Sequence, residues 1–181
     1  MQTTLNRLRE FKPCTDRWAV LLRNLGKTGG DDSPLLIRTI FSLNGFDDAL
    51  WALRAINDSG LYELREYAFW CVDRLNLNSA YYKASMMYDM AKQFHAGQVN
   101  EDDIEYFNYT MSQEDRTIYY TNPLNTSMVN NCVCDIRTTI DSIVNSSIIA
   151  EGGLAAPENI GAAREAAREA RIAQLRTILG L

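Results

Sequence analysis

The sequence predicts an all-α fold, a single-domain bundle of about eight or nine helices over residues 1–181. Apolar side chains recur at helical spacing along most of the chain, and residues that start and end helices separate these stretches. Strand signals are nearly absent, because no stretch sustains an alternation of apolar and polar residues. The chain is also long enough, with 46% hydrophobic residues, to bury a sizeable core.

Five helices are predicted in the first half of the chain. Pro13 stops the first, and the second begins at Cys14 or Thr15 and ends at Gly26. Ser33-Pro34 predicts the start of the third, because Ser is a favourable N-cap and Pro at the first helical position needs no amide partner. The predicted spans are residues 4–11, 15–25, 34–43, 47–56 and 61–76.

Four more helices are predicted in the second half. Asn78-Ser79 and Asn100 are N-cap residues, Gly152-Gly153 ends a helix and Pro157 begins the last one. The predicted spans are residues 78–97, a helix from residue 101 that ends between Met111 and Thr121, 126–150, and an Ala-rich C-terminal helix over 157–179. The connections are short, as in helical bundles, so we expect one domain, and a subdivision would fall near residues 97–100 or at Gly152-Gly153.

The C-terminal helix contains a four-residue repeat over residues 162–170 that places pairs of Ala on one face. We expect a solvated helix that docks through this Ala face. Glu165 and Glu169 have the spacing to pair with Arg164, Arg168 and Arg171 along its surface. A second copy of the chain is an alternative occupant of the Ala face, which would make the protein a homo-oligomer.

The formal net charge of −5 argues against binding of nucleic acid or of an anionic membrane through bulk positive charge. No apolar run approaches the roughly 20 residues of a membrane-spanning helix. The four cysteines are not needed as disulfides in a chain of this length, so a reducing, cytoplasmic setting is expected.

No catalytic motif, cofactor site or metal site is predicted. Cys132 and Cys134 point in different directions on a helix, and His95 is the single histidine, which suits the negative end of a helix. The carboxylates Asp47, Asp48, Glu101 and Asp103 have the chemistry to hold a divalent ion in an unrecognised enzyme. They also lie at predicted helix starts, where acidic residues are expected for a structural reason.

The acidity of the chain is local, because residues 101–150 contain eight acidic and two basic side chains. Tyrosines lie among these carboxylates. This composition is typical of a surface that binds another protein, and the carboxylates would attract a basic partner. The alternative is that the rings fill the core and keep their hydroxyls at the surface. The candidate partner-binding residues are Glu101, Asp102, Asp103, Glu105, Tyr106, Tyr109, Tyr119 and Tyr120.

Several segments resemble a family of small helical proteins of tailed phages and bacteria, some of which are classed as immunity proteins of toxin systems. The segments are Phe11–Ala19, Leu25–Thr28, Asn44–Ala55, Leu64–Val72 and the Ala-Arg-Glu tail that ends in Gln174-Leu175-Arg176. The likeness covers residues 11–97 and 162–179, and its most specific part is Asp-Asp-Ala-Leu-Trp-Ala-Leu-Arg. Members of the family continue into a long helical repeat rich in Ala, Trp and Arg, whereas residues 104–150 here are rich in Tyr, Asn and Thr.

We therefore expect a non-enzymatic helical protein that binds and inhibits another protein, as an immunity-like or phage anti-defence factor does. The resemblance implies no catalytic residue, and it implies the cytoplasm of a bacterial cell or a phage-infected host as the setting. The alternatives are a structural or scaffolding protein of a phage that acts by self-association, and an enzyme that uses carboxylates and a divalent metal.

Overall fold

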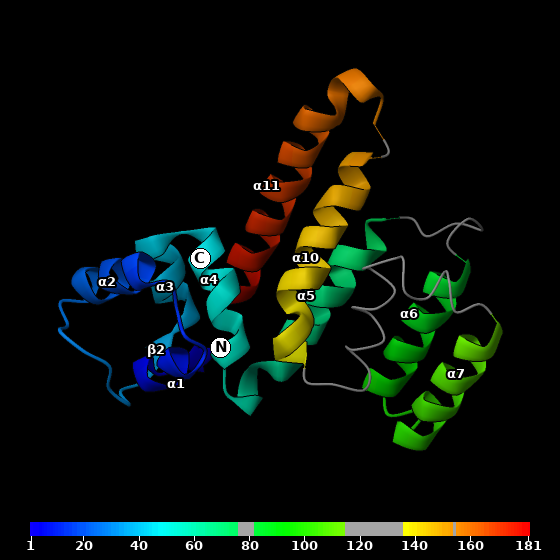
Figure 1. Ribbon diagram of the computed structural model, residues 1–181, viewed down its shortest axis with the longest axis horizontal. Coiled ribbons are helices and arrows are strands. Elements are labelled where there is room, and N and C mark those ends of the chain that lie inside the picture. Colours follow the sequence, from blue (N-terminus) through cyan, green and yellow to red (C-terminus); the bar gives the residue numbers. More distant parts are fainter. Residues whose placement is uncertain (76–81, 115–135, 154) are drawn as a thin grey trace. The chain divides into compact units, whose positions relative to one another are not determined.

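The computed structural model describes residues 1–75, 82–114, 136–153 and 155–181 (Figure 1). Within these residues the chain forms nine α-helices and a single two-stranded sheet of two residues a strand, which confirms the all-α prediction. The helices group into two compact units, one of residues 1–67 with 172–181 and one of residues 68–171. We call them unit 1 and unit 2. Residues 97–100 lie inside unit 2, and the expectation of a single domain stays a prediction.

Unit 1 contains the N-terminal helices, two short strands, the beginning of α5 and the end of α11. Its elements are β1 (Gln2–Thr3), α1 (Leu5–Glu10), α2 (Thr15–Asn24), β2 (Leu35–Leu36), α3 (Ile37–Asn44), α4 (Phe46–Ala52), two 3₁₀ turns (Leu53–Ala55 and Asp58–Gly60), α5 (Leu61–Asp73) as far as Tyr67, and α11 (Ile160–Leu179) from Ile172. Apolar side chains from α1, α3, the first 3₁₀ turn and the residue after that turn are fully buried and contribute to its core, among them Leu5, Leu8, Ile37, Ile40, Leu53 and Ile56.

The start of the third helix differs from the prediction. Helix α3 begins at Ile37, and the prediction of a helix start at Ser33-Pro34 is wrong. Leu35 and Leu36 are extended instead and pair antiparallel with β1, with Leu36 opposite Gln2 and Leu35 opposite Thr3. This pairing also buries Leu35, so a tertiary contact outweighs the local helix-start signal.

Glycines end helices in both units where the sequence indicated that they would. Gly26, Gly45 and Gly97 follow α2, α3 and α6 with φ values of 67°, 89° and 70°. Glycine adopts this left-handed region without the steric cost of a Cβ atom. Cys14 occupies the N-cap of α2, which confirms the predicted start of that helix.

Unit 2 contains the end of α5, the beginning of α11 and three whole helices, α6 (Tyr82–His95), α7 (Glu101–Glu114) and α10 (Ile136–Gly153), with a 3₁₀ turn at Pro157–Asn159. Its core includes Cys71, Val72, Ile136, Ile140, Ile143 and Val144. Tyr88 of α6 is buried there, and its hydroxyl donates a hydrogen bond of 3.0 Å to the Phe69 carbonyl of α5. Phe69 also meets the rings of Tyr88 and His95 edge to face, at centroid distances of 5.6 and 5.5 Å.

The alanine repeat of α11 is only partly used for packing. Ala167 is buried and Ala163 and Ala170 are half-buried, whereas Ala162 and Ala166 are exposed, so the helix docks through part of its Ala face. Arg171 was expected to lie on the solvated surface of this helix, and that expectation is wrong, because its side chain is fully buried. Arg171 is the largest fully buried side chain among the described residues.

Candidate protein-binding surface

A reciprocal hydrogen-bonded cap sets the first residue of α7. The Asn100 N–H donates to Oδ2 of Asp103 at 2.9 Å, and the Asp103 N–H donates to Oδ1 of Asn100 at 3.1 Å. Two amides that a helix start would otherwise leave without partners are thereby satisfied. The cap confirms the predicted helix start at residue 101 and gives Asp103 a structural role.

Helix α7 packs against α6 (Figure 1). Ile104 is buried and Phe107 is half-buried, so these two side chains define the inner face. Tyr106 and Tyr109 are 74% and 64% exposed. The two tyrosines are three residues apart and are therefore neighbours on the helix surface. Their rings do not fill the core.

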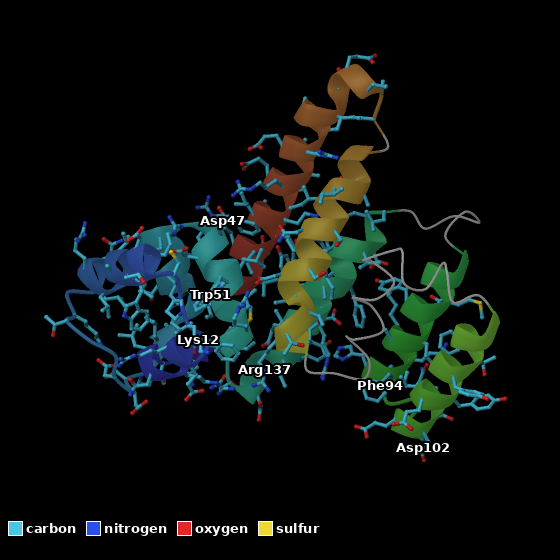
Figure 2. All side chains as sticks on the ribbon, viewed as in Figure 1. Lys12, Asp47, Trp51, Phe94, Asp102 and Arg137 are labelled. Carbon is cyan, nitrogen blue, oxygen red and sulfur yellow. The ribbon has the colours of Figure 1, made fainter. Side chains whose placement is uncertain are left out.

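Four carboxylates adjoin the exposed tyrosines. Glu101, Asp102, Asp103 and Glu105 are all exposed, and Figure 2 shows Asp102 at the start of α7. The first three lie in the first turn, where the helix dipole favours negative charge. We call these four residues together with Tyr106 and Tyr109 the α7 surface. The other two candidate residues, Tyr119 and Tyr120, lie outside the described residues.

The structure does not bring the remaining carboxylate candidates into a metal site. Asp48 of α4 accepts hydrogen bonds from Arg17 and from Asn44, each at 2.8 Å, and Asp47 is exposed beside it. In the described ranges no three His, Cys, Asp or Glu side chains gather in a group suited to a metal ion.

Neither cysteine in the described part of the chain forms a disulfide. Cys14 is exposed, whereas Cys71 is buried. Cys132 and Cys134 lie outside the described residues.

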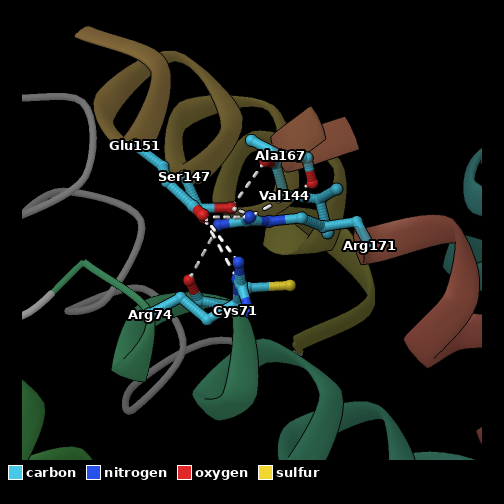
Figure 3. A network of polar contacts seen from close by, with 7 residues as sticks. All are labelled: Cys71, Arg74, Val144, Ser147, Glu151, Ala167 and Arg171. Atoms are coloured by element: carbon cyan, nitrogen blue, oxygen red, sulfur yellow. Dashed lines mark hydrogen bonds and ion pairs between the residues drawn. The ribbon is translucent and has the colours of Figure 1, made fainter. Parts of the chain in front are cut away.

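An ionic cluster around the buried side chain of Arg171 in unit 2 was not expected from the sequence (Figure 3). The guanidinium of Arg171 forms an ion pair with Glu151 of α10 and donates hydrogen bonds to Oγ of Ser147 at 3.2 Å and to the Cys71 carbonyl at 3.3 Å. Arg74 adds a second ion pair to Glu151 at 2.7 Å. The Trp70 ring lies beneath both guanidinium groups, 5.8 Å from Arg171 and 5.2 Å from Arg74.

The charges of this cluster act on the ionisation of Glu151. Partial burial raises the pKa of its carboxyl, but hydrogen bonds and charge attraction from Arg74 and Arg171 outweigh this effect and hold the pKa below its usual value. Glu151 lies in the last turn of α10, where the helix dipole disfavours a carboxylate. That unfavourable position is the signal in the sequence that favours a cation nearby.

No helix in the described part of the chain combines the length and the apolar character that crossing a membrane requires. Comparisons with protein-family models, with curated proteins and with solved structures found no match.

Proposed function

We propose that this chain is a non-enzymatic helical protein that binds another protein through the α7 surface and inhibits it, as an immunity or phage anti-defence factor does. The observation that carries the proposal is the exposure of Tyr106 and Tyr109 next to Glu101, Asp102 and Glu105. The sequence resemblance to immunity proteins supplies the expected biological role.

Exposed tyrosines on a rigid helix are well suited to protein binding. A tyrosine buries a large apolar area and loses little side-chain entropy on binding, and its hydroxyl still forms hydrogen bonds. Buried Ile104 and the cap at Asn100 hold the helix, so the two rings are presented on an ordered backbone. A partner that covered both rings would gain contact area without having to order a loop.

The charge of the surface selects a basic partner. Carboxylates around the rings attract positively charged surfaces before contact and accelerate association, and added salt weakens this attraction. The tyrosines would then supply most of the affinity, because interface energy concentrates in a few aromatic residues surrounded by polar ones.

The first experiment identifies the partner and tests the tyrosines together. The tagged chain and its Tyr106→Ala/Tyr109→Ala variant are used to capture proteins from a bacterial lysate, and the captured proteins are identified by mass spectrometry. Tyr62→Ala is the matched control, since Tyr62 is 63% exposed on α5 in unit 1. We expect one protein to be retained by the original chain and by the control but lost from the double variant. Equal capture by all three would contradict the proposal.

A second experiment tests the charges with the captured protein. Glu101→Gln, Asp102→Asn and Glu105→Gln are combined, and Asp103 is kept because it caps the helix. We expect slower association and a weaker dependence of the association rate on salt. The matched control neutralises three exposed glutamates of the C-terminal region, Glu158, Glu165 and Glu169. Association kinetics that respond equally to both sets would show that bulk charge, and not the α7 surface, attracts the partner.

Self-association remains the rival function, and exposed Ala162 and Ala166 favour it because small residues allow a second helix to approach closely. The molecular mass in solution separates the two functions. A monomer at micromolar concentration would count against a scaffold that forms through α11.

A further inference from the structure

Unit 1 contains an apolar pocket of about 200 Å³ that the proposed function does not use. Side chains of α1, α2, α3 and α4 line it, including Leu8, Leu21 and Ile40. Two indole rings contribute to its wall, Trp18 from α2 and Trp51 from α4 (Figure 2), and both are half-buried. The pocket therefore has the concave, mainly apolar lining that small-molecule sites usually have.

The charged side chains that line the pocket already interact within the chain. Nε of Arg17 donates a hydrogen bond to Oδ1 of Asp48 at 2.8 Å, and the side-chain amide of Asn44 donates to Oδ2 of Asp48 at 2.8 Å. Asp47 also takes part in an interaction of its own. Both carboxylates and the guanidinium are thus engaged before any ligand arrives.

The Trp51 ring already holds a cation. The guanidinium of Arg54 lies 5.0 Å from the centre of that ring, and Nε of Arg54 donates a hydrogen bond to the Trp51 carbonyl at 2.9 Å. With Arg54 included, two guanidinium groups and two carboxylates lie around the pocket, and their formal charges balance. Because each of these groups is already engaged, a ligand of either charge would lose hydration without gaining a partner of opposite charge.

The size of the pocket limits the ligand to one or two rings. An apolar cavity of roughly 150 Å³ holds a benzene molecule. A pocket of about 200 Å³ therefore accommodates a single ring or a fused two-ring system of the size of indole. Rings also suit the walls, because they pack edge to face or offset against indoles with additional attraction.

We propose that this pocket binds an uncharged, apolar small molecule of one or two rings. The walls supply the affinity, because a ligand that covers Trp18 and Trp51 removes apolar surface from water. The site is independent of the α7 surface, which belongs to unit 2. Cys14 lines the same pocket and is exposed, so a ligand that fills the pocket shields its thiol from a reagent.

The first test compares four probes that share the indole ring. Indole and tryptophol are uncharged at neutral pH, whereas tryptamine is a cation and indole-3-acetate is an anion. Tryptophol is the matched control for the side chain of the two charged probes. Each probe is titrated against the folded full chain, and alkylation of Cys14 by iodoacetamide is followed by peptide mass spectrometry. We expect similar dissociation constants for indole and tryptophol, and values about fivefold higher for both charged probes.

A variant tests whether the balance of charge causes this preference. Asp48→Asn removes the carboxylate that Arg17 contacts, so the difference between tryptophol and indole-3-acetate should disappear. Asp32→Asn changes an exposed aspartate that does not line the pocket and should preserve the difference. Circular dichroism checks that both variants are folded, and the comparison of the four probes decides alone if Asp48→Asn does not fold.

Four results would overturn the proposal. The first is absence of Cys14 protection by every probe at millimolar concentration. The second is equal protection by all four probes, and the third is stronger protection by either charged probe than by tryptophol. The fourth is an unchanged order of the probes in folded Asp48→Asn, because the charges around the pocket would then not select the ligand.

Discussion

Arg171 is completely buried in unit 2, and Glu151, 20 residues earlier in the chain, forms an ion pair with its guanidinium. The pair joins α11 to α10, and the hydrogen bond to the Cys71 carbonyl adds α5. A buried arginine costs desolvation energy, and this cost is met only if carboxylate and carbonyl groups receive its donors. Polar contacts of Arg171 therefore join these three helices in addition to their apolar packing.

Glu151→Gln is expected to destabilise the protein more than Arg171→Met does. The glutamine variant leaves a charged guanidinium in the interior without this carboxylate, whereas methionine removes the charge and fills part of the same volume. Breaking one side of a buried pair costs roughly 3–5 kcal/mol, and we expect a somewhat smaller loss of about 2–4 kcal/mol in the free energy of unfolding for Glu151→Gln, because the Glu151 side chain is 23% exposed. Urea denaturation measures both variants.

The matched control for this comparison is Glu165→Gln, an exposed glutamate on the surface of α11. Its effect should be within about 0.5 kcal/mol, as for other surface substitutions. If Arg171→Met proved the more destabilising of the two, the guanidinium would contribute through its hydrogen bonds more than through its charge.

Lowering the pH should remove the contribution of Glu151 to the free energy of unfolding. Its pKa in the folded protein lies below the unfolded reference value of 4.5. The stabilisation is therefore fully present above about pH 4.5 and is lost as the pH falls through the folded pKa, because the unfolded state takes up the proton first. The difference in unfolding free energy between the original chain and Glu151→Gln should shrink between pH 7 and pH 3. A difference that stays constant over this range would contradict the assigned direction.

Two adjacent glycines at the end of α10 should respond differently to alanine. A Cβ on Gly152 would meet Cγ of Arg164 and lie 3.0 Å from the Cα of that residue, whereas a Cβ on Gly153 would meet nothing within 4 Å. Gly152→Ala should therefore cost about 1–3 kcal/mol through overpacking. Gly153→Ala should be neutral or stabilise by up to about 1 kcal/mol, because alanine favours the helix. Thermal unfolding of the two variants measures both effects. A loss of stability only in Gly152→Ala would support the steric explanation, whereas similar changes in both variants would indicate that helix propensity dominates.

Asn100→Ala should destabilise the start of α7. It removes the side-chain acceptor of the Asp103 N–H, which typically costs about 1 kcal/mol. Hydrogen exchange of the amides in the first turn of α7 should accelerate, while exchange in α10 should be unchanged. Asn100→Asp retains an acceptor and should restore most of the protection. Unaltered exchange in Asn100→Ala would mean that contacts with α6 alone hold this turn.

Local signals predicted most of the helices because their causes are local. Gly26 and Gly97 end helices through their own backbone freedom, and the cap of Asn100 with Asp103 spans only four residues. The start of α3 could not be predicted in the same way. Leu35 and Leu36 are extended because they pair with residues 2 and 3, and no window around Ser33-Pro34 contains that information.

The sequence predicted where the candidate surface lies along the chain, but it did not predict that Tyr106 and Tyr109 are exposed. A tyrosine pattern does not distinguish a ring in the core from a ring in solvent, since both environments suit this side chain. Ile104 and Phe107 occupy the inner face of α7, and that choice leaves Tyr106 and Tyr109 outside. Arg171 shows the opposite case, where a residue type typical of surfaces is buried because a carboxylate from another helix reaches it.

The composition of unit 1 from residues 1–67 and 172–181 has a consequence for biosynthesis. A ribosome releases the chain from its N-terminus, so residues 68–171 leave the exit tunnel before the last ten residues of unit 1 do. Leu175 is buried, and Arg176 lies 6.0 Å from the centre of the Phe41 ring within that unit. Residues 1–67 are translated first, but they can complete the packing of unit 1 only after residues 172–181 have emerged. Until then, the apolar side chains that these last ten residues cover stay exposed to solvent.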